Sequence, residues 1–125
     1  CCLNFVTEPE GEPSAVLLRG LTTVHGLDAI CRLRYGKAPD QLTPYQRKNL
    51  LNGPGKCCRA LGLDRRQNGL DLTTGNELFL CTALSDAGLP DRPPRPFTVQ
   101  TGKRIGIDYA QEAVDFPWRF YTTDL

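Results

Sequence analysis

The chain has 125 residues and a formal net charge of +1, from 15 lysines and arginines against 14 aspartates and glutamates. Hydrophobic residues make up 40% of it and charged residues 23%, values typical of one ordinary globular domain or part of one. No apolar run approaches the roughly 20 residues that a membrane span requires, and no signal peptide is visible. The charge balance also excludes the strongly basic overall composition of many nucleic-acid-binding proteins, although basic side chains gather locally.

The N-terminal residues predict a β-hairpin. Residues 2–7 and 15–20 have the composition of strands, and an acidic turn with proline and glycine joins them. If the turn is centred just after Gly11, Asn4 and Arg19 lie roughly opposite each other among apolar neighbours. Polar groups in such a setting require partners, either each other or a ligand. The alternative is an asparagine at a strand edge and an arginine at the surface.

Two helices are predicted after the hairpin. The first is a largely helical stretch over residues 21–35, which has an apolar side at helical spacing. A loop over residues 36–42 follows. Thr43 is then a helix N-cap and Pro44 occupies the first helical position, so that a second helix runs to about Leu51.

Residues 52–66 form the stretch around which the chain is organised. Gly53, Pro54 and Gly55 favour a turn that opens a short helix, and the glycines let another molecule approach the backbone closely. Free amides at the start of a helix, with Lys56 beside them, are a ready site for a phosphate. The alternative is a capped helix at the protein surface.

Less regular structure is predicted for the middle of the chain. Residues 68–74 form a turn with polar side chains, and residues 77–81 form a short strand. The following segment, residues 82–96, carries four prolines and is predicted to be an exposed loop.

The C-terminal residues predict a second pair of strands. Residues 97–101 and 104–108 are expected to pair around the turn Gly102-Lys103. Residues 110–114 form one helical turn, and residues 118–121 form an aromatic strand that packs in the core. Several hairpins with three helices predict an α+β fold, in a single domain over residues 1–125.

The cysteines match neither a zinc site nor a disulfide framework. Four of the six form two adjacent pairs, no CxxC motif occurs, and His25 is the only histidine. We therefore predict no metal. Cys31, Cys57 and Cys58 are expected to pack as small hydrophobic side chains in a reducing compartment.

Several motifs, in order along the chain, resemble the alkyladenine (3-methyladenine) DNA glycosylase family. They are Cys2–Asn4, Ala15–Arg19, Asn52–Lys56, Arg59–Gly62, Asn68–Thr73, Arg104–Ala110 and Pro117–Tyr121. Each motif alone is a weak signal, but together and in the family's order they are specific and cover essentially the whole chain. The resemblance implies curved antiparallel hairpins packed with a few short helices, similar to the C-terminal domain of formyltransferases.

The resemblance implies a role in base-excision repair of DNA. Members of the family hydrolyse the N-glycosidic bond of alkylated or deaminated purines, such as 3-methyladenine and hypoxanthine, that are flipped out of duplex DNA. A glutamate activates the attacking water, and no metal or organic cofactor is needed. The implied partner is damaged double-stranded DNA, with no membrane, and the implied enzyme is a monomer inside the cell.

The resemblance implies a role for individual residues of this chain, each at a position that corresponds to one in the family. Arg19 resembles the arginine that holds the attacking water, and Ile105 falls where a main-chain carbonyl accepts a hydrogen bond from that water. Asn4 matches the asparagine at the pocket floor, which disfavours guanine. Arg65 falls where the family has a basic residue on its DNA face. The loop that contacts the DNA backbone corresponds to Gly53, Pro54, Gly55 and Lys56.

Three parts of the family site have no counterpart in this sequence. The catalytic glutamate, the aromatic residues that sandwich the flipped base and the tyrosine wedge all lie upstream of the segment matching Cys2–Asn4. We therefore expect an N-terminally truncated piece of a longer protein, which alone releases no damaged base. The alternatives are a non-catalytic nucleic-acid-binding module and a tRNA- or protein-binding domain of similar β-rich architecture.

Overall fold

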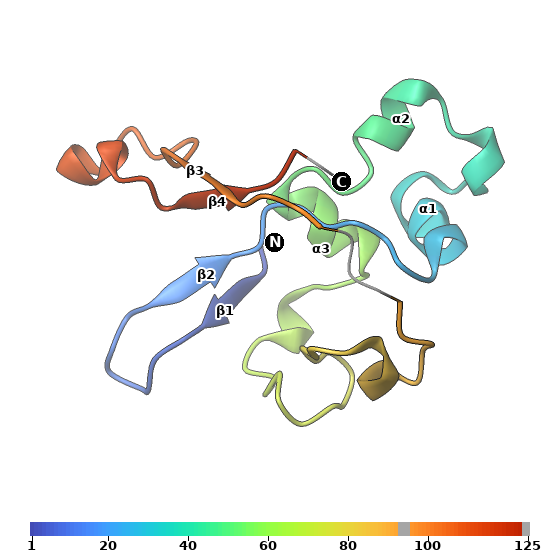
Figure 1. Cartoon of the computed structure of the whole chain (residues 1–125), viewed down its shortest axis with the longest axis horizontal. Coiled ribbons are helices and arrows are strands. Elements are labelled where there is room, and N and C mark those ends of the chain that lie inside the picture. Colours follow the sequence, from blue (N-terminus) through green and yellow to red (C-terminus); the bar gives the residue numbers. More distant parts are fainter. Residues whose placement is uncertain (93–95, 124–125) are drawn as a thin grey trace. The chain divides into compact units, whose positions relative to one another are not determined.

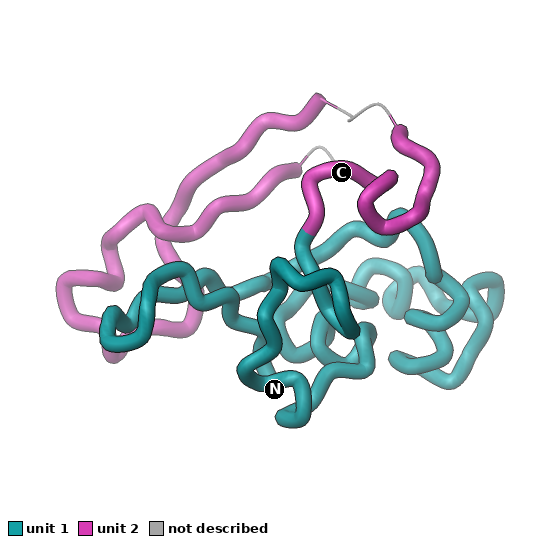
Figure 2. The backbone as a smooth tube through the Cα atoms, turned by 90° about the horizontal axis from the view of Figure 1, so that it is seen from below, with its two compact units in different colours: residues 1–80 teal, residues 81–125 magenta. Residues whose placement is uncertain are grey.

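A computed structural model describes residues 1–92 and 96–123, and the chain divides into two compact units, residues 1–80 and 81–125 (Figure 2). The helices and strands of unit 1 are β1 (Asn4–Val6), β2 (Ala15–Leu17), α1 (Leu27–Tyr35), α2 (Pro44–Lys48) and α3 (Pro54–Ala60), with 3₁₀ helices η1 (Pro39–Gln41) and η2 (Arg65–Gln67) (Figure 1). Those of unit 2 are η3 (Leu84–Ala87), β3 (Gln100–Gly102), η4 (Gln111–Asp115) and β4 (Arg119–Tyr121). This mixture of short helices and antiparallel strand pairs confirms the α+β class.

The N-terminal hairpin is confirmed, but its strands are shorter and its register differs. Asn4 pairs with Leu17, so the predicted pairing of Asn4 with Arg19 is wrong. Thr7 and Ser14 close the turn, through a backbone hydrogen bond of 3.2 Å and a contact of 2.9 Å between their hydroxyls. The turn is therefore centred about one residue earlier than predicted, and Arg19 lies beyond the end of β2.

The first helix is shorter than predicted because glycines delimit it. Gly26 and Gly36, which flank α1, have φ angles of 78° and 66°, in the left-handed region that ends regular helix.

The predicted start of the second helix, α2, is confirmed. The Thr43 hydroxyl accepts a hydrogen bond from the Gln46 N–H (3.2 Å), and the Gln46 side chain accepts one from the Thr43 N–H (3.0 Å).

A small core lies between the helices of unit 1. Its buried residues are Cys31, Leu42, Leu50, Leu51 and Ala60, against which Ile30 and Tyr35 pack. Cys57 and Cys58 on α3 are also buried, so the prediction that three cysteines pack as small hydrophobic side chains is confirmed. Turns and bends precede α3 at residues 49–53, and a turn follows it at residues 61–62.

Three predictions for the second half of the chain are wrong. Residues 77–81 form no strand, and β3 pairs with β4 rather than with residues 104–108. The chain bends at Ile105 and Gly106, where a φ of 73° at the glycine interrupts an extended strand. Trp118 and Phe120 are 58% and 68% exposed instead of packing in a core, since the pair β3–β4 has no second layer among the described residues of its unit.

Other predictions for the second half of the chain are confirmed. Residues 68–74 form turns, and η4 is the predicted helical turn near residues 110–114. Within the predicted loop 82–96, η3 forms a short helix, and residues 93–95 lie outside the described residues.

Thiol reactivity tests this arrangement. Burial raises the pKa of the thiols of Cys31, Cys57 and Cys58, which lowers their thiolate fraction at mildly alkaline pH. We expect iodoacetamide to modify Cys1, Cys2 and Cys81 in the folded chain, because these three are exposed, and to reach the other thiols only after unfolding. Peptide mass mapping measures this; equally fast modification of all six in the folded chain would contradict the fold.

Candidate functional site

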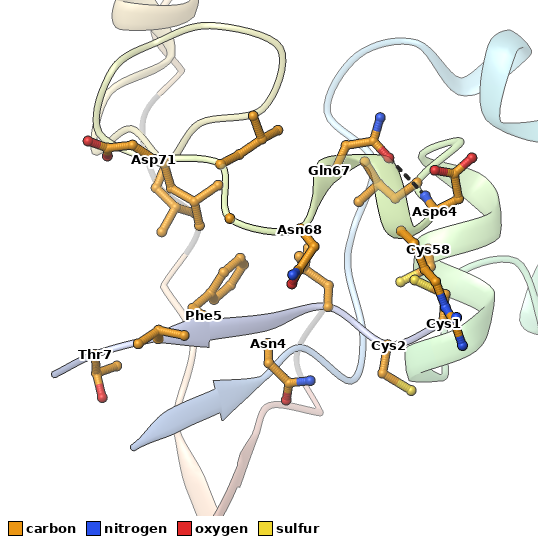
Figure 3. A pocket seen from close by; sticks show the side chains of 18 of the residues that line it. Cys1, Cys2, Asn4, Phe5, Thr7, Cys58, Asp64, Gln67, Asn68 and Asp71 are labelled. Carbon is orange, nitrogen blue, oxygen red and sulfur yellow. Dashed lines mark hydrogen bonds between the residues drawn. The ribbon is translucent and has the colours of Figure 1, made fainter. Parts of the chain in front are cut away.

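Unit 1 contains a cleft of about 930 Å³ beside β1. One wall is the chain's first seven residues, and the other consists of Cys58, residues 63–65 and 67–73, and Leu80. Figure 3 shows Phe5 reaching from β1 into this cleft, toward the side that carries Asn68. Apolar side chains such as Leu63 line much of the cleft, and amide groups stand among them, which is the usual composition of a ligand site.

Asn4 lies in β1 at this cleft, but its side chain leaves the strand on the side opposite to Phe5 (Figure 3). This follows from the alternation of side chains along a strand. Asn4 is exposed, as are Val6 on the same face and its cross-strand partner Leu17. The hairpin face that carries the predicted specificity residue is therefore accessible to a ligand.

Arg19 lies just beyond β2 and is half-buried. Hydrogen bonds on both sides hold its backbone: the Leu18 N–H donates to the Leu3 carbonyl (3.0 Å), and the Leu21 N–H donates to the Leu51 carbonyl (3.2 Å). These bonds tie the arginine's segment both to the start of β1 and to the turn before α3. Asn4 and Arg19 thus belong to the same end of one hairpin, without forming a cross-strand pair.

The Gly53–Lys56 stretch enters α3 as predicted. Gly53 precedes the helix in extended conformation (φ 179°), and Pro54 occupies its first position. The Lys56 ammonium donates to the side-chain oxygens of Asn49 (2.8 Å) and Asn52 (2.7 Å). Because α3 has only seven residues, the feature of this stretch that suits an anion is the lysine charge rather than the helix terminus.

Sequence analysis overlooked the two asparagines that bind Lys56. Asn52 stands four residues before Lys56, but outside the helix, where that spacing does not by itself bring side chains together. Asn49 reaches the lysine only because the turn between α2 and α3 folds back. No local motif in the sequence signals either contact.

Arg65 is the first residue of the short helix η2, where it lines the cleft and is exposed. The adjacent cation, Arg66, is engaged differently: it pairs with Asp64 (3.0 Å) and, through that hydrogen bonding, lowers the pKa of the Asp64 carboxyl. The Gln67 side chain accepts from the Asp64 N–H (2.9 Å), which completes the cap of η2 (Figure 3).

Ile105 belongs to unit 2, where its side chain is 54% exposed and its backbone forms a bend. The preceding Arg104 anchors this bend, since its guanidinium stacks over Trp118 (5.2 Å) and donates to the Ala113 carbonyl (3.4 Å). The structure thus places Asn4, Arg19, Gly53–Lys56 and Arg65 in unit 1 and Ile105 in unit 2.

Residues 1–92 and 96–123 contain neither a candidate metal site nor a candidate membrane span. In that part of the chain, no three histidine, cysteine, aspartate or glutamate side chains are arranged to hold a metal ion. No helix there has the length and apolar character needed to cross a membrane.

Comparison with known proteins agrees with the resemblance drawn from the motifs. The family model described as methylpurine-DNA glycosylase (MPG) matches residues 1–125. Proteins named "Putative 3-methyladenine DNA glycosylase" are similar along nearly the whole chain. That of Clostridium perfringens is 40% identical over 98% of this chain, that of Clostridioides difficile 44% over 96%, and that of Bacillus cereus 42% over 96%.

The chain spans 57%, 59% and 55% of the lengths of these three relatives, respectively. Since the family match extends from the first residue to the last, this chain belongs to the methylpurine-DNA glycosylase family.

Proposed function

We propose that the chain is part of a DNA repair enzyme that hydrolyses the N-glycosidic bond of alkylated or deaminated purines, such as 3-methyladenine and hypoxanthine. The observation that carries this proposal is the family match over all 125 residues. The substrate is duplex DNA from which the damaged nucleotide is flipped out, because the sugar carbon is inaccessible within the stack. The enzyme acts inside the cell, as a monomer.

In the proposed reaction the oxygen of a water molecule forms a bond to the sugar's anomeric carbon. The N-glycosidic bond breaks, its electron pair leaves with the base, and a proton of the water passes to a general base. Arg19 and the main-chain carbonyl of Ile105 hold the water. The general base is the glutamate that the resemblance places upstream of the segment matching Cys2–Asn4, so these 125 residues alone are inactive.

Asn4 is proposed to select the base. Its side chain stands on the accessible face of the hairpin, where it would crowd the exocyclic amino group of guanine. Purines without that group, such as hypoxanthine and 3-methyladenine, avoid this contact. The same face carries apolar neighbours that suit the flat surface of a base.

The DNA backbone is proposed to lie along Gly53, Pro54, Gly55 and Lys56, with Arg65 as a further contact. Residues 41–63, which include this loop, contain four basic side chains (Arg47, Lys48, Lys56 and Arg59) and no acidic one. Such a segment attracts phosphates although the net charge of the chain is only +1.

The alternative of a non-catalytic nucleic-acid-binding module rests on the same basic segment. Such a module would hydrolyse no bond, so it would need neither Arg19 to hold a water nor Asn4 to select a base. The two functions are therefore separated by substitutions at these positions, and not by binding measurements on the loop.

Replacing Gly55 with alanine separates an effect on the stability of the fold from an effect on DNA binding. Gly55 is exposed, and an added Cβ would meet only the Cys1 carbonyl, at the ordinary contact distance of 3.8 Å. We expect Gly55→Ala to leave the free energy of unfolding unchanged or to raise it by up to about 1 kcal/mol, as alanine favours helix. If the DNA backbone approaches this residue, the variant binds duplex DNA more weakly. Urea unfolding and fluorescence anisotropy measure the two effects; unchanged binding would remove Gly55 from the interface.

Arg19 provides the test of the enzymatic proposal. We expect the 125-residue chain to release no hypoxanthine from a hypoxanthine-containing duplex, and the whole protein encoded by its gene to release it. In the whole protein, Arg19→Ala should lower the single-turnover rate roughly 100-fold or more, since a group that orients the water is lost. Arg32→Ala serves as control, because Arg32 is exposed and pairs with Asp28. Equal rates for Arg19→Ala and wild type would refute the assigned role, and release by the isolated chain would refute the proposed division of the site.

A further inference from the structure

The Lys56 ammonium is held between two neutral side chains. Its Nζ donates to Asn49 Oδ1 (2.8 Å) and to Asn52 Oδ1 (2.7 Å), and neither amide carries a charge. The positive charge of the lysine is therefore fixed in place without being neutralised. An ammonium has three N–H donors, so two bonds leave one donor for a further acceptor.

The orientation of the Asn49 amide is set by a bond on its other side. Asn49 Nδ2 donates to the Tyr45 carbonyl (3.0 Å), which turns Oδ1 toward the lysine. The backbone of Asn49 is held as well, because its carbonyl accepts from Arg34 Nη2 (3.1 Å) and from the Tyr35 hydroxyl (3.4 Å). Two side chains of α1 thus hold Asn49, and Asn49 in turn holds the Lys56 ammonium.

The aliphatic part of Lys56 is also positioned. It runs along Gly53, where an added Cβ would lie 3.5 Å from the lysine Cδ, and the residue as a whole is half-buried. The turn beneath it is anchored at Leu51, whose carbonyl accepts from the Leu21 N–H (3.2 Å) and from the Cys57 thiol (3.3 Å). Lys56 therefore starts from a defined rotamer, in a helix whose preceding turn is well supported.

Among the described residues, three other cations are bound by carboxylates instead of neutral side chains. In the part of the chain that the structure describes, ion pairs join Arg32 to Asp28, Arg66 to Asp64 and Lys103 to Asp115, and a carboxylate offsets each charge. Lys56 has amides in the corresponding places. A positioned and uncompensated ammonium in a segment without acidic residues suits one phosphate oxygen of a nucleic-acid backbone.

We propose that Asn49 and Asn52 are positioning residues that hold the Lys56 ammonium ready for one backbone phosphate of the DNA duplex. This inference rests on the proposed function, because it requires DNA to lie along the Gly53–Lys56 loop. The asparagines act by removing the lysine's rotational freedom before DNA arrives, so that less entropy is lost on binding. They do not contact the substrate's reacting atoms.

The test is a set of variants whose affinity for one intact duplex is measured by fluorescence anisotropy between about 50 and 200 mM salt. Lys56→Ala should weaken binding and reduce the slope of log K against log salt by about one. Asn52→Ala and Asn49→Ala should weaken binding roughly three- to ten-fold while leaving the slope unchanged, because the charge remains but loses its position. Asn76→Ala, at an exposed asparagine outside residues 41–63, is the matched control and should bind as wild type.

A double-mutant cycle shows whether the asparagines act through the lysine. In the Lys56→Ala background, Asn52→Ala should cause no further loss of affinity, whereas independent contributions would add. Urea unfolding of each variant accompanies the binding curves, and Asn52→Ala is the decisive variant because Asn52 is exposed in a turn. Asn49→Ala also removes a bond to Tyr45, so its effect on stability is expected to be larger.

The outcomes distinguish this inference from the proposed function. If Lys56→Ala weakens binding but Asn52→Ala binds as wild type, the DNA contact stands and the positioning role is overturned. If Asn52→Ala weakens binding equally with and without Lys56, the asparagine acts independently and the inference also fails. If Lys56→Ala changes neither affinity nor slope, both the positioning role and the proposed DNA contact of this loop are refuted, while hydrolysis by the whole protein remains a separate measurement.

Discussion

The carbonyl group of Leu51 is the point on which the arrangement of unit 1 depends. It accepts hydrogen bonds from the Leu21 N–H, just after the hairpin, and from the Cys57 thiol on α3. Leu51 is itself buried and packs with Cys31 and Ala60 in the small core. One residue thus joins the segment that follows Arg19 to the helix that contains Lys56. Arg19 and the DNA-binding part of the proposed site are therefore built on the same support in unit 1.

Arg34 stabilises the same turn before α3 through its side chain. Its guanidinium donates to the carbonyls of Asn49 and Leu50, both at 3.1 Å, and lies 4.8 Å above the Tyr35 ring. Backbone carbonyls at the end of a short helix would otherwise lack partners within the chain. A turn held this firmly can fix the two asparagines that bind Lys56, which a loose surface loop cannot do.

The sequence predicted those features that depend on neighbouring residues. Thr43 and Pro44 identified the start of α2, and Gly53 and Pro54 identified the start of α3, because caps and turns are local. The burial of Cys31, Cys57 and Cys58 followed from their helical spacing and from the absence of a metal-site pattern. The family motifs correctly identified the family, although no single one was sufficient.

Features that depend on distant contacts could not be predicted. A shift of one residue in the turn moved the partner of Asn4 from Arg19 to Leu17, since strand register is sensitive to the turn's geometry. The partner of β3 lies seventeen or more residues downstream, in β4, and the apparent hairpin around Gly102 competed with it in the sequence. The two asparagines at Lys56 were missed for the same reason, because only the folded turn brings Asn49 to the lysine.

In the proposed enzyme, this chain supplies one wall of the site and its DNA-binding side, and the general base lies elsewhere in the protein. The most direct measurement is the sequence of the encoding DNA immediately upstream of the codon for Cys1. We expect an in-frame extension in which a glutamate-containing segment precedes a tyrosine-rich hairpin. A stop codon or an unrelated sequence at that place would leave Asn4 and Arg19 without a catalytic partner and would contradict the enzymatic account.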